Sequence, residues 1–187
     1  MMLFGVMLLA FSLCAIVPLV LVNKCFITVS AHEALIINRS NGRTLVSFTG
    51  SMVIPIIHKA ETMDMRVKLV RISRSADDPT PCKSGETLVM DAVFYVRVNT
   101  TGDDVIKVAN AIGCKRASDP ETLENLFTAR FSEAIKVVAR ASTFDKLRKN
   151  RESLLDSIIG EVGRDLNGYI VDDLAITRLE AAQRPVS

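Results

Sequence analysis

Residues 3–22 read LFGVMLLAFSLCAIVPLVLV, and no Asp, Glu, Lys or Arg occurs before Lys24. An α-helix needs about 20 predominantly apolar residues to cross the hydrocarbon core of a bilayer, which is about 30 Å thick. Thirteen residues of the stretch are Leu, Ile, Val or Phe, and together they favour insertion by about 4 to 8 kcal/mol. The stretch therefore predicts an N-terminal transmembrane helix, which anchors the rest of the chain to the membrane.

Two alternatives explain the same stretch less well. A cleaved secretory signal has a basic n-region, a shorter apolar core and a small-residue cleavage site, whereas this stretch has no preceding basic residue and no Ala-x-Ala pattern after it. A buried helix of a soluble protein normally has one polar face. Lys24, Arg39 and Arg43 follow the span, so the positive-inside rule predicts a single-pass protein of the cell (inner) membrane with its soluble domain on the cytoplasmic side.

Composition limits the classes of partner and of covalent chemistry. The formal net charge is +2 over 187 residues, with no run of basic residues, which argues against a nucleic-acid surface. The four cysteines are Cys14, Cys25, Cys82 and Cys114, and they form no CxxC motif. Reduced thiols are therefore expected rather than disulfides or zinc ligands, although Cys25 lies where S-acylation can occur in a host that has the enzymes.

β-structure is predicted directly after the span. Residues 27–38 and 44–57 are rich in Val, Ile, Thr and Phe, and Asn41-Gly42 between them is a hairpin signal. A further strand is expected over 61–74, with Met63, Met65, Val67 and Leu69 on one face. The longest strand is expected over 86–98, with an apolar face and a mixed face that helices or a neighbouring subunit would cover.

Residues 52–57 read MVIPII, and Pro55 has no N–H to donate to a β-ladder. The segment is therefore expected at an edge, in a bulge or in a loop. Two interpretations stay open, because different side chains can satisfy each. The apolar residues close the core of the β-structure, or Val53, Ile54, Pro55, Ile56 and Ile57 enter the membrane interface.

Helices follow, and then a last strand. Asp119-Pro120 predicts the start of a helix. Its apolar stripe recurs at three- and four-residue steps through Leu123, Leu126, Phe127, Phe131, Ala134, Ile135 and Val138. Another amphipathic helix is expected over 150–167, with the inward residues Leu154, Leu155, Ile158, Ile159, Val162 and Leu166. A strand over 169–179 completes an α+β domain of two lobes.

We find no pattern typical of an active site. The two histidines, His32 and His58, lie in strand-like contexts without a nucleophile motif. Asp172 and Asp173 would point to opposite faces of a strand, and Asp77-Asp78 before Pro79 is typical of a turn. Walker A, GxGxxG and EF-hand patterns do not occur. The sequence thus predicts no catalytic, cofactor or metal residues, and a hydrolase using His32 or His58 is the least favoured hypothesis.

Several short stretches in order resemble the SPFH or band 7 superfamily, which includes stomatin, prohibitin, flotillin and the HflK and HflC proteins. The stretches are GSMVIPII at 50–57, RISRS at 71–75, KSGE at 83–86, STFDKL at 142–147, Arg151-Glu152 and DLN at 165–167. The chain looks closest to the bacterial flotillin-like membrane proteins. The resemblance implies a transmembrane anchor at 1–24, a β-rich lobe next to the membrane at 25–100, an α/β lobe at 101–180 and a tail at 181–187.

The resemblance also implies a function without catalysis. Such proteins form ring- or cage-like homo-oligomers on a lipid bilayer, organise membrane microdomains, and hold or restrain partner membrane proteins. The alternative is a small membrane-tethered adaptor that regulates a protease or transporter without a large oligomer. Flotillin-like proteins usually continue into a long Ala/Glu-rich helix, whereas this sequence ends at Ser187, just after Pro185. The resemblance leaves open whether the chain is naturally short or the front of a longer one, and whether a cage closes.

Overall fold

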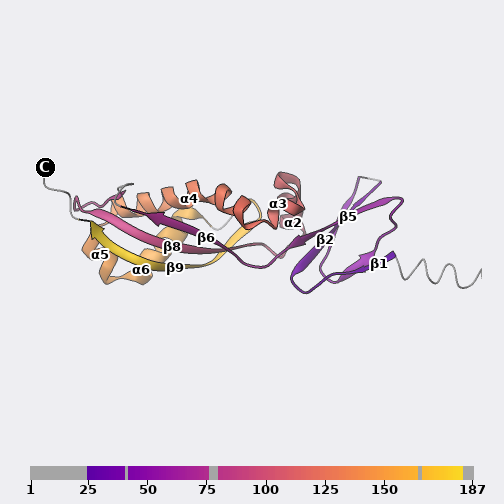
Figure 1. The fold of residues 1–187 in the computed structure, drawn as a ribbon, viewed down its shortest axis with the longest axis horizontal. Helices are drawn as coiled ribbons and strands as arrows, with labels where there is room; N and C mark the ends of the chain where they lie inside the picture. The colour runs from indigo at the N-terminus through magenta and orange to yellow at the C-terminus, as the bar shows by residue number, and fades with distance from the viewer. Residues whose placement is uncertain (1–24, 41, 76–79, 164–165, 183–187) are drawn as a thin grey trace, which may run out of the picture. The chain divides into compact units, whose positions relative to one another are not determined.

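The computed structural model describes residues 25–40, 42–75, 80–163 and 166–182, and Figure 1 shows their fold. The predicted span at 3–22 lies outside these ranges. Among the described residues, no helix combines the length and the apolar character needed to cross a bilayer. The chain divides into two compact units, residues 1–64 and residues 65–187.

This division differs from the boundary expected at residue 100. Strands β6 (Lys68–Arg74) and β8 (Thr87–Val98) were expected in the first lobe. They instead belong to the second unit, because β8 pairs along its whole length with β9 (Tyr169–Ala182), which comes from the far end of the chain. Composition marks where strands occur, but it does not show which distant strand they pair with.

The described part of the first unit is built from five short strands. β2 (Glu33–Arg39) lies between β3 (Thr44–Ser47) and β5 (His58–Asp64), and both pairs are antiparallel. β1 (Phe26–Thr28) pairs with β4 (Gly50–Met52). The predicted hairpin is confirmed between Asn38 and Thr44. The core consists of Leu35, Ile37 and Val53, with Ile27, Val29 and Ala60 packed against it.

Gly50 lies close to the backbone of the neighbouring strand β1. Its φ of +125° lies in the region that favours glycine, and a Cβ there would be 2.6 Å from the carbonyl oxygen of Ile27. The side chain of Ser47 fixes the turn, because its Oγ donates to the Gly50 carbonyl oxygen over 2.7 Å. The Gly50 N–H donates back to the same Oγ over 3.2 Å. Glycine at this position lets β4 lie against β1.

The second unit contains a sheet centred on β8. β6 and β7 (Thr80–Pro81) pair with it on one edge and β9 on the other, all antiparallel. The predicted apolar face of β8 is confirmed, since all six of its residues are buried: Leu88, Met90, Ala92, Phe94, Val96 and Val98. Along the opposite face, Asp91, Val93, Tyr95 and Arg97 are only half-buried.

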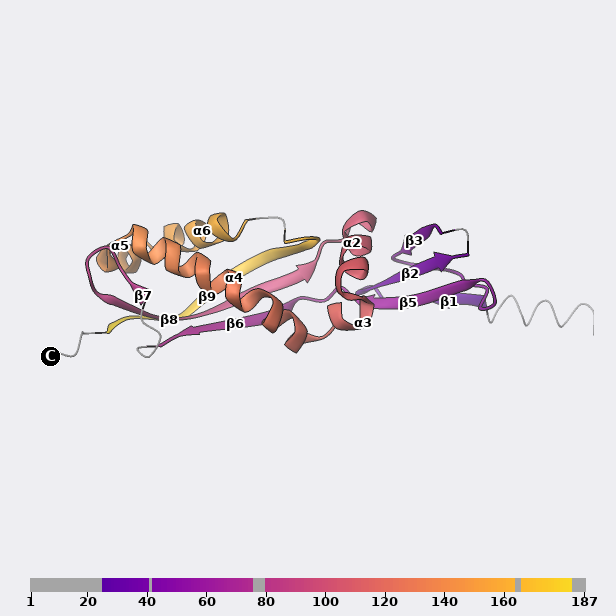
Figure 2. The ribbon, with the colours of Figure 1, turned by 90° about the horizontal axis from the view of Figure 1, so that it is seen from above.

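Five helices follow β8 in the described part of this unit. They are α2 (Gly102–Ile112), α3 (Cys114–Ala117), α4 (Pro120–Ala141), α5 (Phe144–Lys149) and α6 (Arg151–Val162). α4 lies along the sheet with α6 beside it (Figure 2). The predicted start of α4 is confirmed, because Asp119 accepts a hydrogen bond from the Thr122 N–H over 2.9 Å. Phe131 of α4 stacks on Phe94 of β8 with ring centroids 4.1 Å apart.

The predicted strand over 61–74 is interrupted. Residues 65–67 lie between β5 and β6, and the alternation of buried residues shifts by one there. Met63 and Met65 are buried as expected, but Val67 and Leu69 are exposed, and Val70 and Ile72 are buried instead. The prediction for Val67 and Leu69 is therefore wrong, because a non-strand segment does not preserve the period of two.

Candidate membrane interface

The segment between β4 and β5 forms a tight loop in the first unit. The N–H groups of Ile57 and His58 both donate to the Ile54 carbonyl oxygen, over 3.1 and 2.9 Å. The Ile54 N–H donates to Nδ1 of His58 over 3.3 Å, and the Val53 N–H donates to the Cys25 carbonyl oxygen over 2.7 Å. These four bonds hold both ends of the loop, so its side chains project from a backbone of defined shape. The expected loop around Pro55 is confirmed.

The structure separates the five predicted interface residues into two groups. Val53 is only 4% exposed and packs in the core with Leu35 and Ile37. Its side chain therefore packs inside the first unit rather than on its surface. Ile54, Pro55 and Ile57 are exposed, and Ile56 is 93% exposed. An isoleucine with this exposed fraction is unusual on the surface of a soluble protein when its neighbours are also exposed and apolar.

Two further apolar residues lie at the same end of the unit. Phe26 and Met52 are directly opposite each other in the β1–β4 pair and are 54% and 48% exposed. Met52 is two residues before Ile54, and Phe26 lies just after the predicted span. We call Phe26, Met52, Ile54, Pro55, Ile56 and Ile57 the apolar surface. Sequence reasoning missed Phe26 because its neighbour across the strand pair is not visible in the sequence.

The residues considered for catalysis are dispersed. His32 is exposed in the turn before β2, and His58 holds the loop through its Nδ1. Asp172 pairs with Arg97 in the second unit, with Oδ2 and Nε 2.6 Å apart. Asp77 and Asp78 lie outside the described residues. Within the described ranges, no three His, Cys, Asp or Glu side chains come close enough to hold a metal ion.

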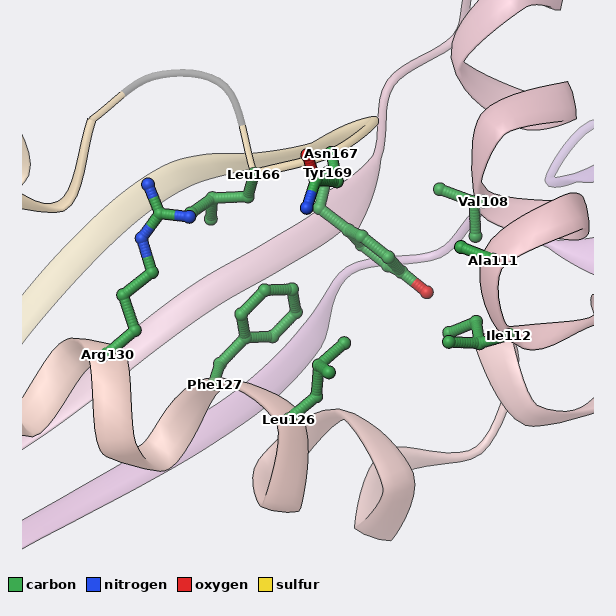
Figure 3. A pocket seen from close by; sticks show the side chains of 9 residues that line it. All are labelled: Val108, Ala111, Ile112, Leu126, Phe127, Arg130, Leu166, Asn167 and Tyr169. Carbon is green, nitrogen blue, oxygen red and sulfur yellow. The ribbon is translucent and has the colours of Figure 1, made fainter.

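A separate pocket of about 190 Å³ lies within the second unit (Figure 3). Val108, Ala111 and Ile112 of α2 line one side, and Leu126 and Phe127 of α4 another (Figure 3). The remaining lining residues are Arg130, Leu166, Asn167 and Tyr169. The side chain of Tyr169 points between the two helices (Figure 3).

The hydroxyl of Tyr169 is a buried polar atom. The residue is 3% exposed, its OH has no hydrogen-bond partner in the described part of the chain, and burial raises the pKa of the phenol. The ring is held edge-on by Phe127, with centroids 5.3 Å apart. A buried hydroxyl without a hydrogen-bond partner costs about 1–3 kcal/mol. The packing of the aromatic ring, and not a bond of the hydroxyl, therefore determines where the Tyr169 side chain lies.

Replacing Tyr169 with Phe is expected to leave the free energy of unfolding unchanged or to raise it by about 1 kcal/mol, because only the unpartnered hydroxyl is lost. Thermal unfolding followed by circular dichroism measures the change. The matched control is Tyr95→Phe at the other tyrosine of the chain, which is half-buried on β8. A loss of about 1 kcal/mol or more for Tyr169→Phe alone would show that the hydroxyl is bonded in solution.

Comparison with known proteins gives two matches. The family described as "SPFH domain / Band 7 family" matches residues 27–184, which span both units. The chain is also 26% identical over 157 residues to the "Flotillin family inner membrane protein YqiK" of Escherichia coli (strain K12). That alignment covers 83% of this chain but 28% of the relative. The chain thus corresponds to about a quarter of the length of this curated relative.

Proposed function

Because the chain belongs to the SPFH domain / Band 7 family, we propose that it is a membrane-anchored, self-assembling scaffold. In this role it organises membrane microdomains and holds or restrains partner membrane proteins, without catalysing a reaction. The observation that carries the proposal is the apolar surface of the first unit, with Ile56 93% exposed. The span predicted at 3–22 and the relative's description as an inner membrane protein support the placement at a membrane.

The apolar surface gives the scaffold a second contact with the bilayer besides the predicted helix. Moving a fully exposed isoleucine side chain out of water is worth about 1.5–3 kcal/mol. The hydrogen bonds that close the loop already fix its backbone, so little conformational entropy is lost on insertion. Each copy adds one such loop and one helix, and a closed oligomer multiplies both contacts.

A tryptophan introduced in place of Ile56 tests whether the loop enters the bilayer. The chain contains no tryptophan, so Ile56→Trp places the only tryptophan of the variant on the loop of the full chain. After reconstitution, we expect blue-shifted emission that brominated lipids quench strongly. The matched control is Val137→Trp, at an exposed apolar position of α4, where we expect weak quenching. Equal, weak quenching at both positions would place the loop outside the bilayer.

The particle mass in mild detergent tests self-assembly. The full chain is extracted and its mass is measured by light scattering or native mass spectrometry. A large discrete oligomer is expected for a scaffold, and imaging then distinguishes a ring from a cage. A monomer would contradict the scaffold and favour the small adaptor, which would co-purify with one partner at a fixed stoichiometry.

A further inference from the structure

The pocket between α2 and α4 combines an apolar wall with one buried polar atom (Figure 3). The apolar residues of the wall are Val108, Ala111, Ile112, Leu126, Phe127 and Leu166. The hydroxyl of Tyr169 points toward the α2 side of this wall (Figure 3), and it has no hydrogen-bond partner in the described part of the chain. An apolar lining with a polar group that can orient a ligand is typical of small-molecule sites.

The ring of Tyr169 is held in place before any ligand binds. Gly168 lies tightly against α2, since a Cβ at this residue would be 2.7 Å from the Asp104 carbonyl oxygen. The Gly168 carbonyl oxygen accepts from the Asn99 N–H over 2.9 Å, and Phe127 packs edge-on against the tyrosine ring. A hydroxyl fixed in this way loses little conformational entropy when it bonds to a ligand.

Water is a poor partner for this hydroxyl. An ordered buried water needs about two to four polar partners, whereas the hydroxyl points toward the aliphatic side chains of Ala111 and Ile112 (Figure 3). Arg130 also lines the pocket, but its Nη2 donates to the Val162 carbonyl oxygen over 2.8 Å, and its guanidinium lies at the opposite end of the pocket (Figure 3). Burial raises the pKa of the phenol, so the hydroxyl stays protonated and can donate to an acceptor.

The volume of the pocket limits the ligand to about one ring. The pocket measures about 190 Å³, and an engineered apolar cavity of about 150 Å³ binds benzene, so a single ring with a short substituent fits. Leu126 is a wall that can turn, because its side chain is 47% exposed and exposed side chains change rotamer within nanoseconds. Such a turn gives the ligand access to the hydroxyl, which is shielded from solvent in the structure.

We propose that this pocket binds an uncharged molecule of about one ring, whose carbonyl oxygen accepts a hydrogen bond from the Tyr169 hydroxyl. The apolar wall disfavours a charged ligand, because a buried charge loses its hydration. The ligand would also cover Leu126, which the periodicity of α4 places in the buried stripe and which the structure leaves exposed. The inference does not rest on the proposed function, because the lining belongs to the second unit and shares no residue with the apolar surface.

Two matched probes test the hydrogen bond. Para-fluoroacetophenone carries the carbonyl oxygen, and para-fluoro-α-methylstyrene has a CH₂ group in its place. Each is titrated against the full chain in a neutral mild detergent, and binding is measured from the broadening of its fluorine NMR signal, with detergent alone as the blank. We expect both probes to bind. Tyr169→Phe is expected to weaken the binding of para-fluoroacetophenone about fivefold, the effect of one neutral hydrogen bond, and to change that of the styrene by less than about twofold.

Two leucine variants test whether the probes occupy this pocket. Ala111 and Ala129 are both exposed alanines of helices, but of the two only Ala111 lines the pocket. Ala111→Leu places a larger side chain in the pocket and is expected to weaken the binding of both probes about tenfold or more. Ala129→Leu is expected to leave both affinities unchanged. Melting curves show that the variants fold.

Three results would overturn the proposal. Signals no broader than in detergent alone would show that the full chain has no such site. Equal losses of both probes in Tyr169→Phe would show that the hydroxyl does not bond to the carbonyl oxygen. Equal effects of Ala111→Leu and Ala129→Leu would place the binding elsewhere. Each of these results is independent of the quenching of Ile56→Trp and of the particle mass, so it leaves the proposed function standing.

Discussion

Replacing Ile158 with Asp is expected to unfold the unit formed by residues 65–187. Ile158 is 0% exposed and lies on the buried side of α6 with Leu154 and Val162. A carboxylate at this position must either lose its hydration without a partner or take up a proton, and each is costly. We expect a loss of at least about 4 kcal/mol, which is comparable to the whole stability of a marginal domain.

Thermal or urea unfolding, followed by circular dichroism, measures this loss. The matched control is Ser157→Asp, which adds the same charge to an exposed position of the same helix, and we expect a change within about 0.5 kcal/mol. A melting curve for Ile158→Asp close to that of Ser157→Asp would show that the buried side of α6 faces water in solution.

Replacing Gly50 with Ala is expected to destabilise the first unit by about 2–4 kcal/mol, through backbone strain and a steric clash together. The φ of +125° is strained for any side chain, and the new Cβ would be 2.6 Å from the Ile27 carbonyl oxygen and 3.0 Å from the Thr28 Cα. Both contacts are with backbone, so a rotamer change cannot relieve them. β1 must move away from β4, and the start of the loop moves with it.

Hydrogen exchange measured by mass spectrometry on the full chain locates this effect. Faster exchange is expected in the peptides that contain β1 and β4, including the Val53 amide that donates to Cys25. Gly42→Ala is the matched control, because Gly42 also has a positive φ, +77°, but a Cβ there meets nothing within 4 Å. It isolates the cost of the backbone conformation, about 1 kcal/mol. Equal effects of the two variants would contradict a clash at Gly50.

Periodicity predicted the helices well at the centre of each apolar stripe and less well at its margins. Leu123, Phe127 and Phe131 of α4 are buried as expected, but Leu126 is exposed. On α6, Ile158 is buried, whereas Ile159 is only half-buried. The period of 3.6 places a stripe to within about one residue. Which marginal residue is covered depends on the neighbouring element, and the sequence does not name that neighbour.

The strands show the same limit more sharply. The alternation along β8 predicted its buried face completely, because the strand is uninterrupted on that face. Residues 65–67, between β5 and β6, shift the alternation of buried and exposed residues by one position. The prediction therefore assigned Val67 and Leu69 to the wrong face. Arg74 was not predicted to be buried, yet its guanidinium donates to the Thr80 and Ser132 hydroxyls. Ser132 lies 58 residues further along the chain, and such a long-range partner is set by the fold as a whole.

For the candidate site, the sequence predicted the loop but not its division between core and surface. Pro55 and the surrounding apolar residues marked the segment, and the open question was whether they pack inward or meet the membrane. The structure shows which side chains pack inward, with Val53 in the core and Ile56 exposed. The hydrogen bond from Ile54 to His58 could not be predicted, because it depends on the path that the turn takes.

The anchoring of Val53 in the core has a geometric consequence under the proposed function. Ile56 is three residues from a side chain that cannot move without disturbing Leu35 and Ile37, so its distance from the sheet is fixed. The loop then acts as a spacer that sets how far the sheet stands from the bilayer surface. Under the proposed function, identical copies would therefore share one height above the membrane.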